Sequence, residues 1–211
     1  MRDFYARASR QIKPEEILVQ EIIPGDGDCQ FSYCAFFRDG KALNTLTALR
    51  HRQHPREFGR AATYVESVDA PDIEPLSERF LKAINFYGVA EIEYKRDPRD
   101  GQYKLLDVNA RIWGFQSLGP PAGVDFAYLL YADQMGEPVS PSRGRAGVGW
   151  IRMLTDLTVA LPDVLRGRLK LSTYLGTLGR SRAEAVFCMK DPLPSLAEIA
   201  LLPYFILKKY F

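Results

Sequence analysis

Apolar and polar residues alternate with a period of two around residues 89–94 and again around residues 105–109, which predicts two β-strands. Between these runs stands the sequence DPRDG, whose proline, aspartates and glycine favour a tight turn. The two strands therefore form an antiparallel hairpin. A second hairpin is predicted from residues 30–38 and 41–50, because Asp39-Gly40 between them is a strong turn signal.

Helical spacing dominates the other long segments. In residues 73–87 the apolar side chains recur every three or four positions, as on the buried stripe of an amphipathic helix. Further helices are predicted at 124–134, 150–161, 162–169 and 195–210. The order of elements indicates an α+β fold, with an antiparallel sheet and packed helices over residues 1–140 and a mostly helical, basic extension over residues 141–211.

The first predicted hairpin carries a concentrated set of polar side chains. Glu91 and Glu93 share one face of the first strand, and Asp107 and Asn109 share one face of the second. Carboxylates beside apolar strand positions are costly to bury unless something pairs with them. Three hard oxygen ligands on a rigid sheet suit Mg²⁺, and Arg111 is spaced to reach a phosphate oxygen. The alternative is an exposed hairpin face with solvated charges.

The segment EIEYKRDPRDGQYKLLDVNAR resembles the metal-binding segment of ATP-grasp enzymes, and specifically of the carboxylate–amine ligases. The resemblance implies that Glu93, Asp107 and Asn109 bind Mg²⁺, or Mn²⁺, together with the phosphates of ATP. It gives Arg111 the role of steadying the transferred phosphoryl group and Glu91 that of a supporting neighbour. The residue before Arg111 is alanine here, where the family often has proline.

A second motif, ILVQEIIPG at residues 17–25, resembles the hinge strand through which the backbone of ATP-grasp enzymes recognises adenine. By this resemblance Gln20 and the backbone of Glu21 and Ile23 contact adenine, and Asp28 is placed for the ribose hydroxyls. An extended segment that ends in Pro-Gly has free backbone donors and acceptors for a purine edge. The alternative is an ordinary hairpin strand.

Two further segments are candidates for contact with a substrate. Arg50 and Arg52 could place positive charge near a phosphate or a carboxylate, although a solvated basic loop explains them equally well. The Gly/Pro-rich sequence WGFQSLGPPAG begins directly after Arg111. It could contact substrate, or it could serve to pack Trp113 and Phe115.

The resemblance covers residues 15–140 and implies the C-terminal half of a ligase. A complete ATP-grasp enzyme has phosphate-binding lysines and a glycine-rich loop in a preceding lobe. The sequence has neither a glycine-rich cradle before residue 16 nor a Walker-type loop later. We therefore expect a fragment, or a separate chain or dimer mate that supplies the remainder, with small-molecule carboxylate and amine substrates. The competing hypothesis is a non-catalytic module that binds nucleotide or serves as a scaffold for a partner chain.

Charge and cysteine content narrow the function classes further. The net charge is +2, which does not indicate nucleic-acid binding. Residues 141–211 carry 11 Lys/Arg against 5 Asp/Glu and end in the apolar sequence LLPYFILKKYF. That end could contact an anionic membrane surface, but a helix packed on a partner is the favoured interpretation. Three cysteines without metal-ligand spacing, and an N-terminus without a hydrophobic leader, indicate a cytoplasmic protein.

Overall fold

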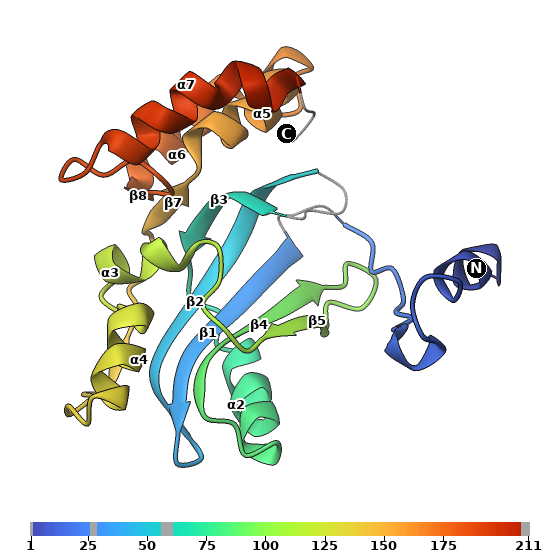
Figure 1. The fold of residues 1–211 in the computed structure, drawn as a ribbon, viewed down its shortest axis with the longest axis vertical. Coiled ribbons are helices and arrows are strands. Elements are labelled where there is room, and N and C mark those ends of the chain that lie inside the picture. Colours follow the sequence, from blue (N-terminus) through green and yellow to red (C-terminus); the bar gives the residue numbers. More distant parts are fainter. Residues whose placement is uncertain (1, 26–28, 56–60, 208–211) are drawn as a thin grey trace.

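One eight-stranded sheet forms the centre of the molecule (Figure 1). The computed structural model describes residues 2–25, 29–55 and 61–207. The strands are β1 (Gln30–Arg38), β2 (Lys41–His54), β3 (Ala61–Ser67), β4 (Gly88–Arg96), β5 (Tyr103–Asn109), β6 (Ser142–Arg143), β7 (Gly149–Ile151) and β8 (Ser181–Glu184). They are ordered β5-β4-β1-β2-β3-β7-β8, and β6 pairs with β2 beside this path.

Helices cover the two faces of the sheet and its β7–β8 end (Figure 1). The α-helices are α1 (Arg2–Ala8), α2 (Ile73–Ala83), α3 (Gly119–Ala122), α4 (Phe126–Gln134), α5 (Met153–Leu165), α6 (Leu171–Arg180) and α7 (Leu193–Leu207), with short 3-10 helices η1 (Pro14–Glu16) and η3 (Gln116–Leu118). The longest strand pairs are antiparallel, and only the short pairs β2–β6 and β7–β8 are parallel. The predicted α+β class and both predicted hairpins are therefore confirmed.

Alternation along β1 divides the hydrophobic core into two parts, because successive side chains of a strand point to opposite faces. Tyr33, Ala35 and Phe37 lie in the part that packs against α2. Cys34 and Phe36 lie in the other part, on the face covered by η3, α3 and α4. The aromatic members of this second part are Phe36, Trp113, Phe115, Phe126 and Trp150. The segment that follows Arg111 therefore packs in the core, and Trp113, Gly114 and Phe115 of this segment also line a cleft. Contact of this segment with a substrate stays a prediction.

Four predicted elements differ from the structure. The helix expected at 162–169 is not a separate helix, because α5 continues through Pro162 and ends at Leu165. The helix expected at 150–161 begins at Met153, because Trp150 belongs to β7, where it pairs with Val65 of β3. A short apolar run is compatible with a buried strand as well as with a helix. The helix expected at 73–87 ends at Ala83, since Asn85 and Gly88 have positive φ values and turn the chain into β4. The expected hinge strand at 17–25 forms no strand within the described part of the chain.

A buried ion pair ties the C-terminal segment to the sheet. Arg52 of β2 donates through Nε and Nη2 to the two carboxylate oxygens of Asp156 in α5, at 2.8 and 2.9 Å. Asp156 is fully buried, and the Arg52 guanidinium lies over the rings of Tyr64 and Tyr174. The strands β6, β7 and β8 belong to the same sheet as the preceding strands. Residues 141–211 are therefore joined to the rest of the chain both by strand pairing and by this ion pair. The domain boundary at residue 140 stays a prediction.

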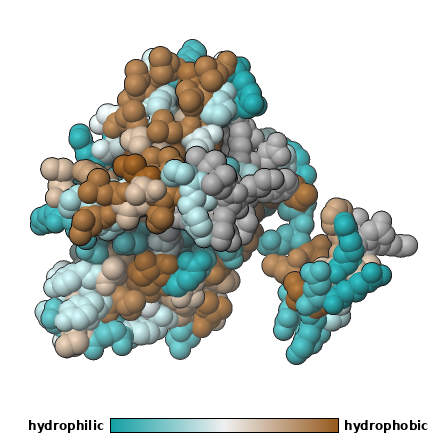
Figure 2. All heavy atoms as spheres, turned by 45° about the horizontal axis from the view of Figure 1, so that its top comes forward, coloured by the Kyte–Doolittle hydropathy of each residue, from teal (hydrophilic) through white to brown (hydrophobic). Residues whose placement is uncertain are grey.

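Many large apolar side chains are exposed on the C-terminal helices and on the N-terminal segment, residues 4–22. This segment extends away from the main body (Figure 2). In α7 these are Leu193, Leu196, Ile199, Leu201 and Tyr204. No helix in the described ranges combines the length and the apolar composition that crossing a bilayer requires. The expectation that the C-terminal helix packs on a partner, or contacts a membrane surface, stays a prediction.

We expect Arg52→Met to lower the free energy of unfolding by about 3 kcal/mol, because it leaves the carboxylate of Asp156 buried without a partner. Urea denaturation followed by circular dichroism measures the change. Arg168→Met is the matched control, since it removes an arginine whose side chain is 47% exposed in its ion pair with Asp163. The control should lose less than about 1 kcal/mol. Equal losses in the two variants would contradict the assignment of Arg52 as an anchor.

Candidate functional site

The site lies where one face of the sheet changes from apolar to polar. Along β1, this face carries Phe36 and Cys34 in the core and then Ser32. Along β4, Val89 of the same core is followed by Glu91 and, two residues on, by another glutamate. Because residues two apart in a strand share a face, the polar group continues directly from the hydrophobic core.

Strand register brings the four predicted polar residues together. Glu91 pairs with Asn109 across β4 and β5, and Glu93 pairs with Asp107. The Asn109 side chain donates through Nδ2 to Glu91 Oε2 and to Glu93 Oε1, at 3.3 Å each. One amide therefore bridges both carboxylates of β4, and it leaves its own oxygen for other partners. The clustering expected from the alternating pattern is present.

The two carboxylates of β4 have different surroundings. Glu93 Oε2 accepts a hydrogen bond from Gln30 Nε2 at 2.7 Å and lies 3.2 Å from Nη2 of Arg50. Glu91 is 2% exposed and accepts a hydrogen bond from Ser32 Oγ at 2.8 Å. Burial, and then the charge of Glu93, raise the pKa of Glu91 to about 7. The hydrogen bond from Ser32 and the charge of Arg50 offset this rise in pKa only in part.

Asp107 and Arg111 stand at the open side of the site. Both are exposed, and Asp107 Oδ1 accepts a hydrogen bond from the backbone N–H of Val108 at 2.8 Å. Arg111 donates through Nη1 to the backbone oxygen of Ile112 at 3.1 Å. Neither side chain is committed to an ion pair of the described residues, so both are available to a ligand in the adjoining cleft.

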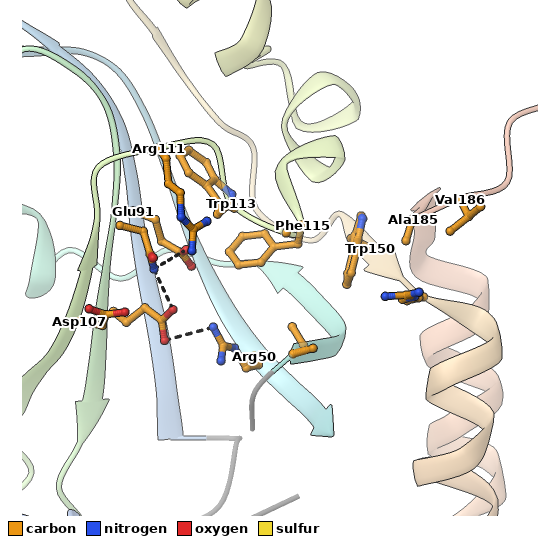
Figure 3. Close-up of a pocket in the computed structure, with 15 residues that line it drawn as sticks. Arg50, Glu91, Asp107, Arg111, Trp113, Phe115, Trp150, Ala185 and Val186 are labelled. Carbon is orange, nitrogen blue, oxygen red and sulfur yellow. Dashed lines mark hydrogen bonds and ion pairs between the residues drawn. The ribbon is translucent and has the colours of Figure 1, made fainter. Parts of the chain in front are cut away.

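A cleft of about 620 Å³ connects these groups with an apolar surface (Figure 3). Its polar lining consists of Arg50, Glu91, Glu93, Asp107, Asn109, Arg111 and Arg152. The remaining lining residues are Ala61, Ala62, Trp113, Gly114, Phe115, Trp150, Ala185 and Val186. Figure 3 shows the labelled acidic residues on one side, Trp150, Ala185 and Val186 across from them, and Phe115 between the two groups. The volume is within the range of small-molecule sites.

The donor set is suitable for a hard cation bound jointly with a ligand. Carboxylate and amide oxygens are the ligands preferred by Mg²⁺, which usually keeps several waters or phosphate oxygens. Among the described residues, no group of three or more His, Cys, Asp or Glu side chains is arranged to hold a metal ion by itself. An ion here would therefore need Asn109 and a bound phosphate besides the carboxylates. The assignment of Glu93, Asp107 and Asn109 as ligands stays a prediction.

Sequence comparisons with known proteins find a partial match to a ligase. No family model matches the sequence. A D-aspartate ligase from Enterococcus faecium (strain Aus0004) is 27% identical over 99 residues, which are 46% of this chain and 23% of the ligase. The chain thus spans less than a quarter of that relative.

Solved structures give the fold. The biotin carboxylase domain of 2-oxoglutarate carboxylase from Hydrogenobacter thermophilus, in complex with MgADP, ADP and bicarbonate, superposes with a TM-score of 0.53. It is 15% identical and covers 70% of this chain, which corresponds to 34% of that domain. A biotin carboxylase domain of a thermophilic 2-oxoglutarate carboxylase bound to bicarbonate gives the same values. The chain has an ATP-grasp fold. The resemblance inferred from the sequence is confirmed at the level of the fold.

The segment that resembles the ATP-grasp hinge lies beside β5 but does not line the cleft. Gln20 donates through Nε2 to the backbone oxygen of Leu106, next to a register shift of β5, and Glu21 pairs with Arg99 at 2.8 Å. Ile23 is buried. Contact of Gln20, Glu21 and Ile23 with adenine stays a prediction. Asp28, predicted to bind ribose, lies outside the described residues.

Sequence reasoning missed several residues of this cleft. Gln30 and Ser32 donate hydrogen bonds to the glutamates of β4. Two polar residues at one end of an otherwise apolar strand could have indicated a polar site there. Trp150, Ala185 and Val186 come from a segment without a recognisable motif. Of the two arginines considered for anion binding, the structure brings Arg50 to the cleft and commits Arg52 to Asp156.

We expect Glu91→Gln to change how the stability depends on pH. In metal-free buffer, an unfolded glutamate loses its proton near pH 4.5, whereas folded Glu91 loses it near pH 7. The folded state therefore binds the extra proton between these values, and the stabilisation is lost as the pH rises through this window. Relative to the wild type, Glu91→Gln should gain roughly 3 kcal/mol of unfolding free energy between pH 4 and pH 8.

Urea unfolding at several pH values in the presence of EDTA measures this difference. Glu15→Gln is the matched control, because Glu15 is exposed in η1. Its difference from the wild type should not change with pH. A Glu91→Gln difference that is equally independent of pH would show that Glu91 ionises as an ordinary carboxyl.

Proposed function

We propose that this chain is the metal- and phosphate-binding lobe of a Mg·ATP-dependent carboxylate–amine ligase, which forms an amide-type bond through an acyl phosphate. The observation that carries the proposal is the convergence of Glu93, Asp107, Asn109 and Arg111 on one cleft of an ATP-grasp fold. The name of the D-aspartate ligase relative supports the same reaction class. The biotin carboxylase domain of similar fold was solved with MgADP, which supports the nucleotide and the metal of the proposal.

In this proposal Glu93, Asp107 and Asn109 would hold Mg²⁺, or Mn²⁺, which would bind together with ATP. When bound, the cation neutralises charge on the β- and γ-phosphates. The closeness of two carboxylates, Glu91 and Glu93, on one strand face supports a cation at this position. The Asn109 amide orients both carboxylates through Nδ2.

Arg111 has one role in the proposed phosphoryl transfer, which is to stabilise charge. A carboxylate oxygen of the substrate attacks the γ-phosphorus of ATP, the bond to the bridging oxygen breaks, and ADP leaves with that electron pair. Arg111, exposed at the cleft, stabilises the negative charge on the transferred group. The amine then attacks the carbonyl carbon of the acyl phosphate, and inorganic phosphate leaves as the amine gives up a proton.

Adenine would lie toward the segment that holds Gln20, Glu21 and Ile23, and Asp28 would be placed for the ribose. The phosphate-binding lysines and the covering loop would come from another lobe, in a longer protein, a separate chain or a dimer mate. The matched relatives are much longer than this chain, which supports such an arrangement. A cytoplasmic location is also part of the proposal.

We expect isothermal titration calorimetry to detect Mg·ATP binding by the wild-type chain and its loss in Asp107→Ala. The reason is that Asp107 supplies an exposed carboxylate at the mouth of the cleft, beside Glu93. Asp100→Ala is the matched control, because it removes an aspartate of the same hairpin that does not line the cleft. The control should bind as the wild type does, and ATP without Mg²⁺ should bind at least about tenfold more weakly.

Absence of Mg·ATP binding by the wild-type chain would favour the second candidate, a scaffold that acts only with a partner chain. Equal binding by wild type and Asp107→Ala would exclude Asp107 as a ligand. That result would overturn the assignment of the metal site while leaving nucleotide binding in place.

A further inference from the structure

The cleft has two chemically different halves. The half on β4 and β5 contains the carboxylates, Asn109 and Arg111, which the proposed function uses for metal and phosphate. The other half is lined by Phe115, Trp150 and Val186 with small neighbours, and the proposed metal and phosphate chemistry makes no use of it (Figure 3). Such a lining favours an apolar group of a ligand over a charged one.

The apolar half is built as a fixed surface. Phe115 and Trp150 are each 3% exposed, and their ring centroids lie 6.3 Å apart. Trp150 donates through Nε1 to Ser117 Oγ at 2.8 Å, which fixes the orientation of the indole. The loop that carries Val186 is held by hydrogen bonds from the backbone N–H groups of Val186 and Phe187 to Glu184. The surface is therefore formed before a ligand binds.

Arg50 stands between the two halves with unused hydrogen-bonding capacity. It is 7% exposed, lines the cleft and forms one ion pair, from Nη2 to Glu93 Oε2. Its buried Nε has no partner in the described part of the chain. A guanidinium has five N–H donors, so this one has donors left for an anion beside the proposed metal ligands.

We propose that the carboxylate substrate is a monocarboxylic acid with a bulky apolar body, aromatic or branched. Its carboxylate meets Arg50, and its body lies against Phe115, Trp150 and Val186. This inference rests on the proposed ligase function and specifies the substrate class of the same site.

A small dicarboxylic acid such as aspartate fits this cleft less well. Its second carboxylate would lie against the apolar wall and lose hydration without a new partner. Arg152 also lines this end of the cleft, but its guanidinium is paired with Glu198 of α7 at 3.1 Å. The charge at that end is therefore already compensated.

The chain contains its own reporter for this surface. It has two tryptophans, Trp113 and Trp150, and both line the cleft. Tryptophan fluorescence of the full chain, titrated with 3-phenylpropionate, 3-phenylpropionamide and aspartate in the presence of Mg²⁺, reads binding without any need for turnover. We expect 3-phenylpropionate to bind at least about tenfold more tightly than either of the other two probes.

Variants separate the two contacts. Val186→Asp should weaken binding of 3-phenylpropionate about tenfold, while Val186→Ile, which keeps an apolar side chain, should not weaken it. Arg50→Gln should reduce the affinity for the acid to that for the amide. Aspartate binding as tightly as 3-phenylpropionate, or an amide binding as tightly as the acid, would overturn the proposal.

The calorimetric titration of Mg·ATP on the same sample separates failure of this inference from failure of the proposed function. If Mg·ATP binds and 3-phenylpropionate does not, the substrate class is wrong and the ligase proposal stands. If 3-phenylpropionate binds as expected and Mg·ATP does not, the acid-binding site stands and the proposed role of this chain in binding Mg·ATP is overturned.

Discussion

Two carboxylates on one face of β4 impose the constraint on which the rest of the site depends. Glu91 and Glu93 lie two residues apart at the edge of the hydrophobic core, where ionising both is costly. The fold compensates with a hydroxyl and an amide from β1, an amide from β5 and one guanidinium from β2. Arg50 forms its ion pair with Glu93, so buried Glu91 relies on hydrogen bonds and its pKa is raised to about 7.

The polar half of the site could be predicted from the sequence because it is local. Two strands joined by a short turn have few possible registers, and the alternation already places Glu93 and Asp107 on one face. The partners on β1 and β2 could not be predicted in the same way. They reach the glutamates only because β1 lies between β4 and β2, and no local pattern specifies this strand order.

Arg50 and Arg52 illustrate the limit of pattern reasoning. Strict alternation gives both the same face of β2, yet the pairing with β3 passes from Arg50–Val65 directly to Arg52–Tyr64. Such a register shift turns the following side chain toward the other face of the sheet. Arg50 therefore lines the cleft, while Arg52 anchors α5. A single extra residue thus separates a candidate ligand contact from a structural anchor.

The ion pairs Arg50–Glu93 and Arg52–Asp156 position different halves of the cleft. The pair of Arg50 and Glu93 belongs to the polar half, most of whose residues lie on the β4–β5 hairpin. The pair of Arg52 and Asp156 holds α5, and β7 with Trp150 comes directly before that helix. The apolar wall is therefore positioned by a long-range contact and by a segment without a motif. Likeness of fold therefore does not reveal the choice of substrate, which depends on the residues of this wall.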